Sequence, residues 1–220
     1  MWRGPGKQPL GSPGYRGIKR DVKMLPEHLA EAGYRTGAFG KWHLGELEGE
    51  IPNDRGFDEF RGFLKGAHPY WIKPGRSKIM HNREPDQTSE GHTTELFTQW
   101  AEKFIRKNAA KDDPFFCYLA YNAVHGPLRT DESKPASAPE AWVKKALDRG
   151  VSFLRSDYVA ILEHMDHNIG RLVDLLDELG IADNTLIVFV SDNGGCTMDE
   201  GAAGGRFPGN NGPFSGGKAT

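Results

Sequence analysis

Residues 156–190 read SDYVAILEHMDHNIGRLVDLLDELGIADNTLIVFV, and this stretch decides the class of fold. Its apolar side chains recur at alternating steps of four and three residues, which places them on one stripe of a helix that ends at Gly180. They are Tyr158, Leu162, Met165, Ile169, Leu172, Leu176 and Leu179. After a short link, Thr185–Val190 is a β-branched run typical of a central parallel strand. This order predicts an α/β fold with a mostly parallel central sheet and helices on both faces.

The remaining sequence predicts further elements of the same fold. Residues 93–107 show helical spacing, and residues 24–32 are a short helix candidate that Gly33 ends. Thr36–Phe39 and Pro114–Tyr121 are predicted strands. We expect an irregular N-terminal segment at residues 1–23, one partial domain over residues 24–220, and long loops within it at residues 46–91 and 126–150.

Composition and charge exclude several classes of protein. The net charge of −2 over 220 residues gives no global basic field for nucleic acid or an anionic membrane. No segment approaches the roughly 20 apolar residues that span a bilayer, and the first residues lack the apolar core of a signal peptide. The chain is therefore expected to be cytoplasmic, or exported with a leader that is not in this sequence. Its two cysteines, Cys117 and Cys196, do not make a disulfide framework.

Polar side chains gather directly after three of the predicted strands. In open α/β sheets, active sites form beyond the carboxyl ends of the strands. The residues at these positions are Lys41 and His43, Asn122 and His125, and Asp192 and Asn193. We therefore treat these three clusters as the candidate functional residues.

The pair Asp192 and Asn193 has two interpretations. A carboxylate and an amide oxygen are hard ligands that suit Ca²⁺ or Mg²⁺. Asp-Asn-Gly is also common turn chemistry at the end of a strand. Since Ca²⁺ takes about 6–8 oxygen ligands, a metal would need further carboxylates from elsewhere.

The basic candidates have structural alternatives too. His125 leaves a strand and is followed by Gly-Pro, so it is placed either to act as a general acid or to hydrogen-bond its own loop. Lys41, His43 and Lys218 are either anion-binding residues or solvated loop residues. The other histidines carry no strong pattern: His164 and His167 fit solvated or capping residues better than metal ligands, and His68, His81 and His92 have no constellation around them.

Five segments occur in the same order as in a known family. They are residues 25–45 (LPEHL through GKWHLG), 55–58 (RGFD), 121–127 (YNAVHGP), 183–194 (DNT through SDNG) and 216–218 (GGK). Together, over about residues 24–220, they resemble the sulfatase family, including its arylsulfatases and N-acetylgalactosamine-6-sulfatases. The resemblance implies part of an alkaline-phosphatase-like α/β sandwich that hydrolyses sulfate esters, with carbohydrate sulfates as expected substrates.

The resemblance also implies roles for single residues. Lys41 and Lys218 would hold sulfate oxygens, His43 would contact the nucleophile, and His125 would protonate the leaving alcohol. Asp192 and Asn193 would bind Ca²⁺. The chemistry agrees, because a sulfate ester gains negative charge on its leaving oxygen in the transition state, and cations and a protonated histidine stabilise that charge.

Two features of the family are missing from these 220 residues. Family members carry a strand with paired Asp residues and a Cys-x-Pro-x-Arg motif (or its Ser version), whose first residue becomes formylglycine. Cys117 and Cys196 both lack the Pro and Arg that the motif needs. We therefore expect an internal piece of a sulfatase-like hydrolase that is inactive alone. A sheet without its first strand would expose an apolar edge, so we also expect low stability or aggregation.

Two other functions remain open. The first is a phosphoester or phosphonate hydrolase of the same superfold, which a second metal site rich in Asp and His would favour. The second is a non-catalytic domain that binds sulfated glycans through Lys41, His43 and Lys218. The expected partner is a sulfated small molecule or glycan, and the oligomeric state and compartment stay open, although family members are commonly exported.

Overall fold

The computed structural model describes residues 17–126, 128–129, 132–195 and 211–217. Within these residues the chain forms two compact units. The first, here called the sheet unit, holds residues 17–123 and 164–183. The second, called the helical unit, holds the described residues of 124–163 and 184–217. The expected single domain over residues 24–220 stays a prediction.

The sheet unit is built on five strands in the order β5-β4-β2-β1-β7. Three of them run parallel: β1 (Arg35–Lys41) lies between β2 (Glu59–Phe63) and β7 (Phe115–Ala120). The strands β4 (Ile79–His81) and β5 (Glu84–Asp86) continue the sheet in antiparallel pairing. Because β1, β2 and β7 are parallel, their carboxyl ends meet at the same edge, where Lys41 ends β1 and Asn122 follows β7.

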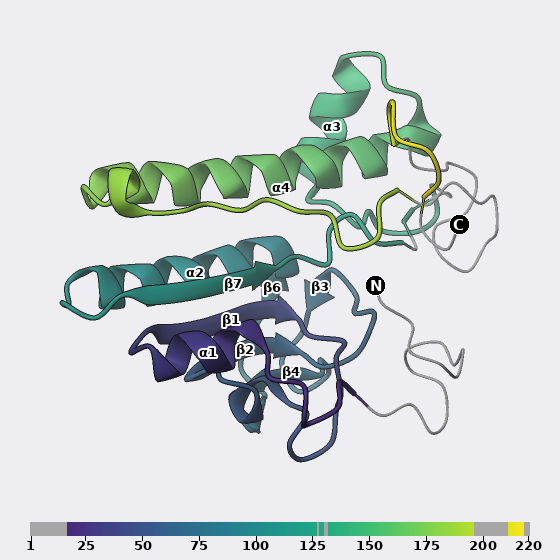
Figure 1. Ribbon diagram of the computed structural model, residues 1–220. Coiled ribbons are helices and arrows are strands. Elements are labelled where there is room, and N and C mark those ends of the chain that lie inside the picture. The colour runs from purple at the N-terminus through teal and green to yellow at the C-terminus, as the bar shows by residue number, and fades with distance from the viewer. Residues whose placement is uncertain (1–16, 127, 130–131, 196–210, 218–220) are drawn as a thin grey trace. The chain divides into compact units, whose positions relative to one another are not determined.

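Side chains of β1 point alternately to two apolar layers, so both faces of the sheet are covered. Phe39 packs into the cluster formed with α2 (Thr93–Ala109), whereas Ala38 packs into the cluster that includes Met24 at the start of α1 (Leu25–Glu31). Figure 1 shows α1 and α2 on opposite sides of β1. The predicted arrangement, a mostly parallel sheet between helices, is confirmed.

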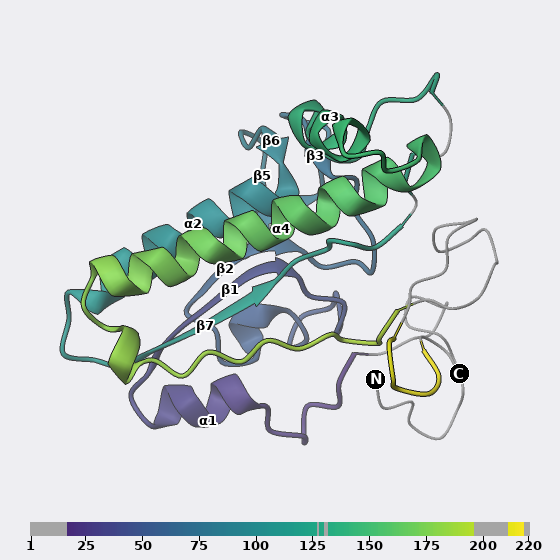
Figure 2. The same cartoon turned by 90° about the horizontal axis from the view of Figure 1, so that it is seen from above.

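The helix α4 (Phe153–Glu178) runs through both units. Its part in the sheet unit lies beside α2 (Figures 1 and 2), where Arg171 pairs with Glu102 at 2.8 Å and Arg106 pairs with Glu178 at 2.8 Å. The 3/4 spacing predicted this helix at almost its observed bounds.

The smaller elements complete the two units. The helical unit contains α3 (Glu140–Asp148), and the sheet unit contains the two-stranded pair β3 (Trp71–Ile72) and β6 (Gly91–His92). Short 3-10 turns lie at Pro52–Asp54 and Ala182–Asn184. No described helix has the length and apolar character that crossing a bilayer requires.

The predicted loops at residues 46–91 and 126–150 are wrong in part. The first contains β2 to β5, and the second contains α3. The strand β2 escaped detection because Glu59–Phe63 has no β-branched residue and an Arg and a Gly in its middle. It forms because its backbone pairs with β1 over five residues, from Gly37 opposite Glu59 to Lys41 opposite Phe63.

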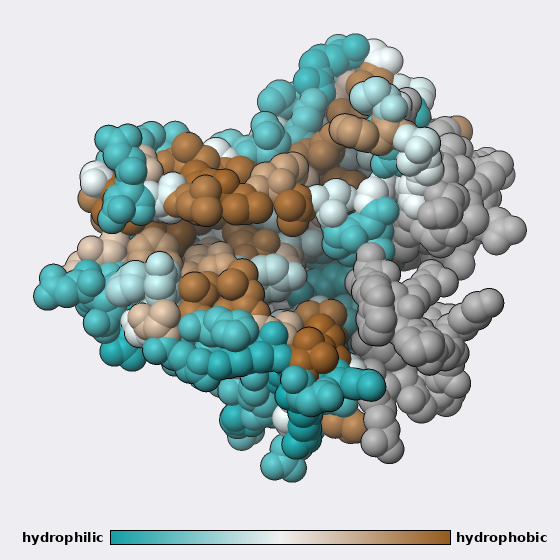
Figure 3. All heavy atoms as spheres, viewed as in Figure 1, coloured by the Kyte–Doolittle hydropathy of each residue, from teal (hydrophilic) through white to brown (hydrophobic). Residues whose placement is uncertain are grey.

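The predicted buried strand Thr185–Val190 is also wrong. The structure assigns no strand to this run, and its side chains from Leu186 to Val190 are 58–89% exposed. Apolar side chains that reach the surface are visible in Figure 3, and Leu186–Val190 is the longest continuous run of them in the described part of the chain. Strand propensity reflects packing on neighbouring strands, and no ladder of the described residues includes this run.

Candidate functional site

The loop after β1 holds Lys41 and His43 through the residue between them. Trp42 is buried, its indole N–H donates to the carbonyl of Glu50 at 2.8 Å, and its ring meets the edge of Phe57 at 6.0 Å. The buried Trp42 therefore anchors the loop between Lys41, the last residue of β1, and His43.

His43 has a strained backbone that the surrounding structure holds in place. Its φ is 54°, in the left-handed region that few non-glycine residues adopt. Its N–H donates to the carbonyl of Leu64 at 2.9 Å, and its ring lies so close to Gly66 that a Cβ there would be 2.4 Å from Cε1. Such strain concentrates at functional sites, so this geometry supports a functional role for His43.

Two further residues join this edge from β7 and from the segment after β2. Asn122 follows β7, and its side-chain N–H₂ donates to the carbonyl of His68 at 3.3 Å. The hydroxyl of Tyr70 donates to the backbone carbonyl of Asn122 at 3.2 Å. Asn122 was a sequence candidate, but His68 was missed because its contacts come from residues far away in the chain.

His68 is oriented and partly shielded by its neighbours. Its ring lies 5.0 Å from that of Phe63 at an angle of 30°, and its Nδ1 donates to the carbonyl of Pro69 at 2.7 Å. Burial lowers the pKa of His68 below its ordinary value, although the bond to Pro69 opposes that shift. His68 is thus a neutral imidazole with its Nε2 as an acceptor near neutral pH.

The helical unit contains the next sequence candidate, His125. Its Nδ1 donates to the carbonyl of Gly126 at 2.6 Å, so the loop fixes the ring. The N–H groups of Arg129, Ser137 and Ala138, which follow His125 in the chain, donate at 2.8–3.0 Å to the buried carboxylate of Asp157 on α4. Asp157 therefore anchors the segment that follows His125. The sequence did not reveal this role of Asp157.

Asp192 and Asn193 lie in a second loop of the helical unit. The side-chain N–H₂ of Asn193 donates to Asp192 Oδ2 at 2.6 Å, and Gly194 turns the backbone with a φ of 73°. Asn211 then ties this loop to the segment before Lys218, because it bonds to Gly195 N–H at 2.6 Å and to the Gly216 carbonyl at 2.8 Å. Lys218 itself lies outside the described residues.

The donor set does not make a calcium site by itself. Asp192 and Asn193 offer two side-chain oxygens, whereas Ca²⁺ takes about 6–8. In the described part of the chain, no group of three His, Cys, Asp or Glu side chains could hold a metal ion.

The structure distributes the candidates over two units. Lys41, His43 and Asn122 lie in the sheet unit, and His125, Asp192 and Asn193 lie in the helical unit. Within the sheet unit, His164 and His92 turn out to be core residues: His164 Nε2 lies 3.1 Å from Glu95 Oε1, and His92 accepts from Thr94 N–H at the start of α2. Cys117 lies in β7, where burial raises the pKa of its thiol to about 12.

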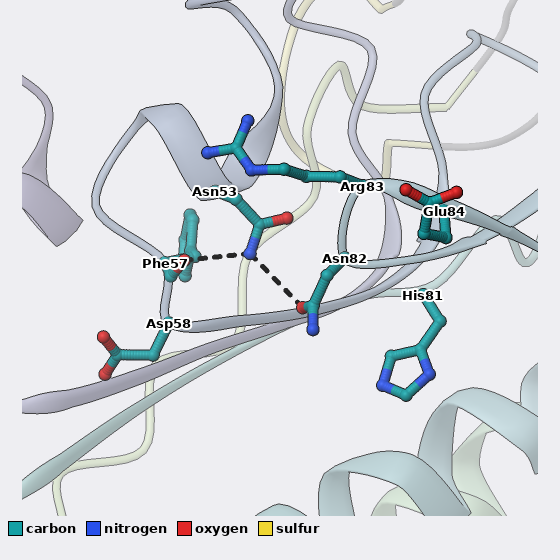
Figure 4. Close-up of a pocket in the computed structure, with 7 residues that line it drawn as sticks. All are labelled: Asn53, Phe57, Asp58, His81, Asn82, Arg83 and Glu84. Atoms are coloured by element: carbon teal, nitrogen blue, oxygen red, sulfur yellow. Dashed lines mark hydrogen bonds between the residues drawn. The ribbon is translucent and has the colours of Figure 1, made fainter.

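A cavity of about 520 Å³ lies elsewhere in the sheet unit. It is lined by Asn53, Phe57, Asp58, His81, Asn82, Arg83 and Glu84 (Figure 4). It adjoins the start of β2, whereas Lys41 is aligned with the end of β2. The side chain of Asn53 donates to Asn82 Oδ1 at 3.3 Å and to the carbonyl of Phe57 at 3.2 Å. The amide side chains of Asn53 and Asn82 thus stabilise the cavity wall.

Comparison with known proteins decides the family. A family model described as Sulfatase matches residues 3–219 of this chain. The chain belongs to the sulfatase family. This sulfatase is 33% identical over 217 residues to the N-acetylgalactosamine-6-sulfatase of Rattus norvegicus and 32% identical over 217 residues to that of Homo sapiens. Each match covers 93% of this chain and 38% of the relative.

Solved structures confirm the sulfatase fold. The structure of Ps i-CgsB in complex with k-i-k-neocarrahexaose is 34% identical, with a TM-score of 0.72, and the match covers 82% of this chain and 42% of that chain. The sulfatase PsFucS1 from Pseudoalteromonas sp. is 23% identical with a TM-score of 0.60, which shows the fold alone. The resemblance read from the motifs and the alkaline-phosphatase-like fold are both confirmed. This sulfatase chain spans about two fifths of the length of the relatives it matches.

Proposed function

We propose that this chain is part of an enzyme that hydrolyses sulfate esters of carbohydrates. The observation that carries the proposal is the geometry of the loop after β1, in a chain of the sulfatase family. Trp42 anchors that loop from inside, and His43 is held in a strained conformation. The loop therefore offers a fixed cationic wall to a compact anion before the substrate arrives, as electrostatic preorganisation requires.

In this proposal each basic residue acts on a defined part of the substrate. Lys41 and Lys218 bind sulfate oxygens, and His43 contacts the nucleophile. His125 protonates the leaving alcohol. Because its Nδ1 proton is engaged by the carbonyl of Gly126, the transferred proton comes from Nε2 of the imidazolium. These roles rest on the family motifs together with the local geometry of each loop.

We further propose that Asp192 and Asn193 contribute two of the oxygens around a Ca²⁺ ion. This part rests on the type of ligand and on the family, because the two side chains are too few alone. The side-chain bond between Asn193 and Asp192 keeps both groups at the same turn.

The 220 residues alone are proposed to hydrolyse sulfate esters slowly or not at all. The sequence contains no Cys-x-Pro-x-Arg motif. Cys117 cannot replace that nucleophile, because the thiolate is the reactive form and burial raises the pKa of this thiol to about 12. The absence of this motif from the 220 residues also favours the second candidate function, which is binding of sulfated glycans without turnover. No observation favours a phosphoester hydrolase.

Two measurements test the proposal. Titration of the chain with phenyl sulfate and with phenyl phosphate measures binding, and release of phenol measures turnover. We expect phenyl sulfate to bind and to release little phenol over hours. Robust turnover that His125→Ala abolishes would contradict the proposed inactivity but support the proposed reaction. Binding of phenyl phosphate with no binding of phenyl sulfate would contradict the sulfatase proposal itself.

A further inference from the structure

The carboxyl-terminal edge of the sheet carries a polar pair of which one member, His68, lies outside the five family segments. It consists of His68 and Asn122, which contact each other through the bond from the Asn122 side chain to the His68 carbonyl, 3.3 Å long. Both belong to the sheet unit, as does Lys41.

Asn122 fixes the position of His68. Only 4% of Asn122 is exposed, and it bonds to the segment after β2 twice, through its side chain to His68 and through its carbonyl to Tyr70. Its Oδ1 is buried and has no hydrogen-bond partner among the described residues. Burying an amide oxygen in this way is unfavourable, and the bond that the Asn122 N–H₂ group donates to the His68 carbonyl offsets part of that cost.

His68 presents an acceptor at this edge. Its Nδ1–H is engaged by the carbonyl of Pro69, which leaves Nε2 with a lone pair while the ring is neutral. Burial lowers the pKa of His68, which keeps the ring neutral near pH 7. A neutral acceptor does not attract a sulfate oxygen, but it binds a hydroxyl group.

The position of His68 relates it directly to the sulfate-binding loop. Its ring lies on that of Phe63, and Phe63 is the residue of β2 that pairs with Lys41 of β1. Neighbouring strands are about 4.8 Å apart, so the imidazole lies on the order of 10 Å from the Lys41 backbone. The His43 ring contacts Gly66, two residues before His68. A sugar ring attached to a sulfate at Lys41 spans a gap of this size.

We propose that His68 is a specificity residue, which accepts a hydrogen bond from a hydroxyl group of the sugar that carries the sulfate ester, and that Asn122 is its positioning residue. The inference rests on the proposed function and extends it. Lys41 and His43 recognise the sulfate, whereas His68 recognises the sugar. Sugar sulfates therefore bind more tightly than aryl sulfates, which lack the hydroxyl group.

Calorimetric titration of the 220-residue chain with galactose 6-sulfate and with phenyl sulfate tests this division. The variant His68→Asn keeps a donor for the Pro69 carbonyl but removes the acceptor at Nε2. The variant His68→Phe keeps an aromatic ring next to Phe63 but removes both the donor to the Pro69 carbonyl and the acceptor at Nε2. We expect both variants to weaken galactose 6-sulfate binding about 5-fold, the effect of one hydrogen bond, and to leave phenyl sulfate binding unchanged.

The matched control is His81→Asn, since His81 is exposed and lies on β4, opposite Arg61 of β2. It should change neither affinity. The preference for galactose 6-sulfate should also decrease in acid, below the ordinary histidine pKa of about 6.5, because a protonated His68 no longer accepts a hydrogen bond.

The outcomes separate the two proposals. Equal losses for both ligands in the His68 variants, or no loss for either, would overturn the specificity role and leave the proposed function intact. Binding of phenyl sulfate with no preference for galactose 6-sulfate in the unmodified chain would overturn it as well. If the unmodified chain binds neither ligand, the proposed function fails and the specificity role fails with it.

Discussion

Replacement of Gly40, near the end of β1, should damage the strand pairing that precedes the loop with Lys41 and His43. Its φ is +112°, and a Cβ there would lie 2.1 Å from the carbonyl oxygen of Ala120, its partner in the pairing of β1 with β7. The backbone strain of a non-glycine residue costs about 1–3 kcal/mol. Overpacking against a carbonyl held in a ladder adds about 1–3 kcal/mol. Gly40→Ala should therefore lower the free energy of unfolding by about 4 kcal/mol.

A matched variant separates these two contributions. Gly33 also has a positive φ, +87°, but a Cβ at this position would meet nothing within 4 Å. Gly33→Ala should therefore cost only the backbone strain, about 1–2 kcal/mol. Urea unfolding of both variants, followed by circular dichroism, measures the difference. If Gly40→Ala costs no more than Gly33→Ala, the close approach of β1 and β7 is not a constraint, and the reasoning is refuted.

Three further predictions concern single side chains. Asp157→Ala should lower the free energy of unfolding by about 3 kcal/mol, because three backbone N–H groups lose their acceptor. The control Asp166→Ala, on the exposed face of α4, should change the free energy of unfolding by less than about 0.5 kcal/mol. Urea titration of the two variants measures the difference. Burial lowers the pKa of His164 despite the nearby Glu95, so the unfolded chain binds this proton more tightly than the folded chain, and stability should be lost as the pH falls below about 6.5. The urea midpoint of His164→Gln should therefore change less between pH 8 and pH 5 than that of the unmodified chain. Equal changes in the two proteins would contradict this prediction. The raised pKa of the half-buried Cys117 thiol should make its reaction with iodoacetamide at pH 8 slower in the folded chain than in urea, as mass spectrometry can show; equal rates would contradict the raised pKa.

Much of the fold follows from local pattern. The stripe on α4 and the apolar runs at β1 and β7 are visible in the sequence because each helix or strand buries one or both faces. The strand ends then predict where Lys41 and Asn122 lie, since parallel strands end at the same edge.

Features that depend on distant partners could not be predicted. The strand β2 exists because β1 offers it a ladder, and the apolar run Thr185–Val190 is no strand because none of the described ladders includes it. The same limit applies to His68. Its ring is placed by Phe63 and its carbonyl by Asn122, which is 54 residues away. No spacing rule connects these positions.

The strain at His43 was also hidden from the sequence. Nothing in the residues Gly-Lys-Trp-His indicates a φ of 54°. It arises because the His43 N–H bonds to Leu64 while the ring contacts Gly66, so two residues of the segment after β2 hold it. The motif therefore names the candidate residues, and the neighbouring strand supplies their geometry.

The affinity of the chain for inorganic sulfate, with and without the Lys41 ammonium group, tests the central claim most directly. Calorimetric titration should show sulfate binding that Lys41→Ala weakens at least about tenfold, since one charge-assisted hydrogen bond contributes about 1.5–3 kcal/mol. Lys103→Ala, which removes an exposed lysine of α2, is the matched control and should leave the affinity unchanged. Equal affinities of the unmodified chain and Lys41→Ala would contradict the claim that the loop after β1 binds the sulfate group.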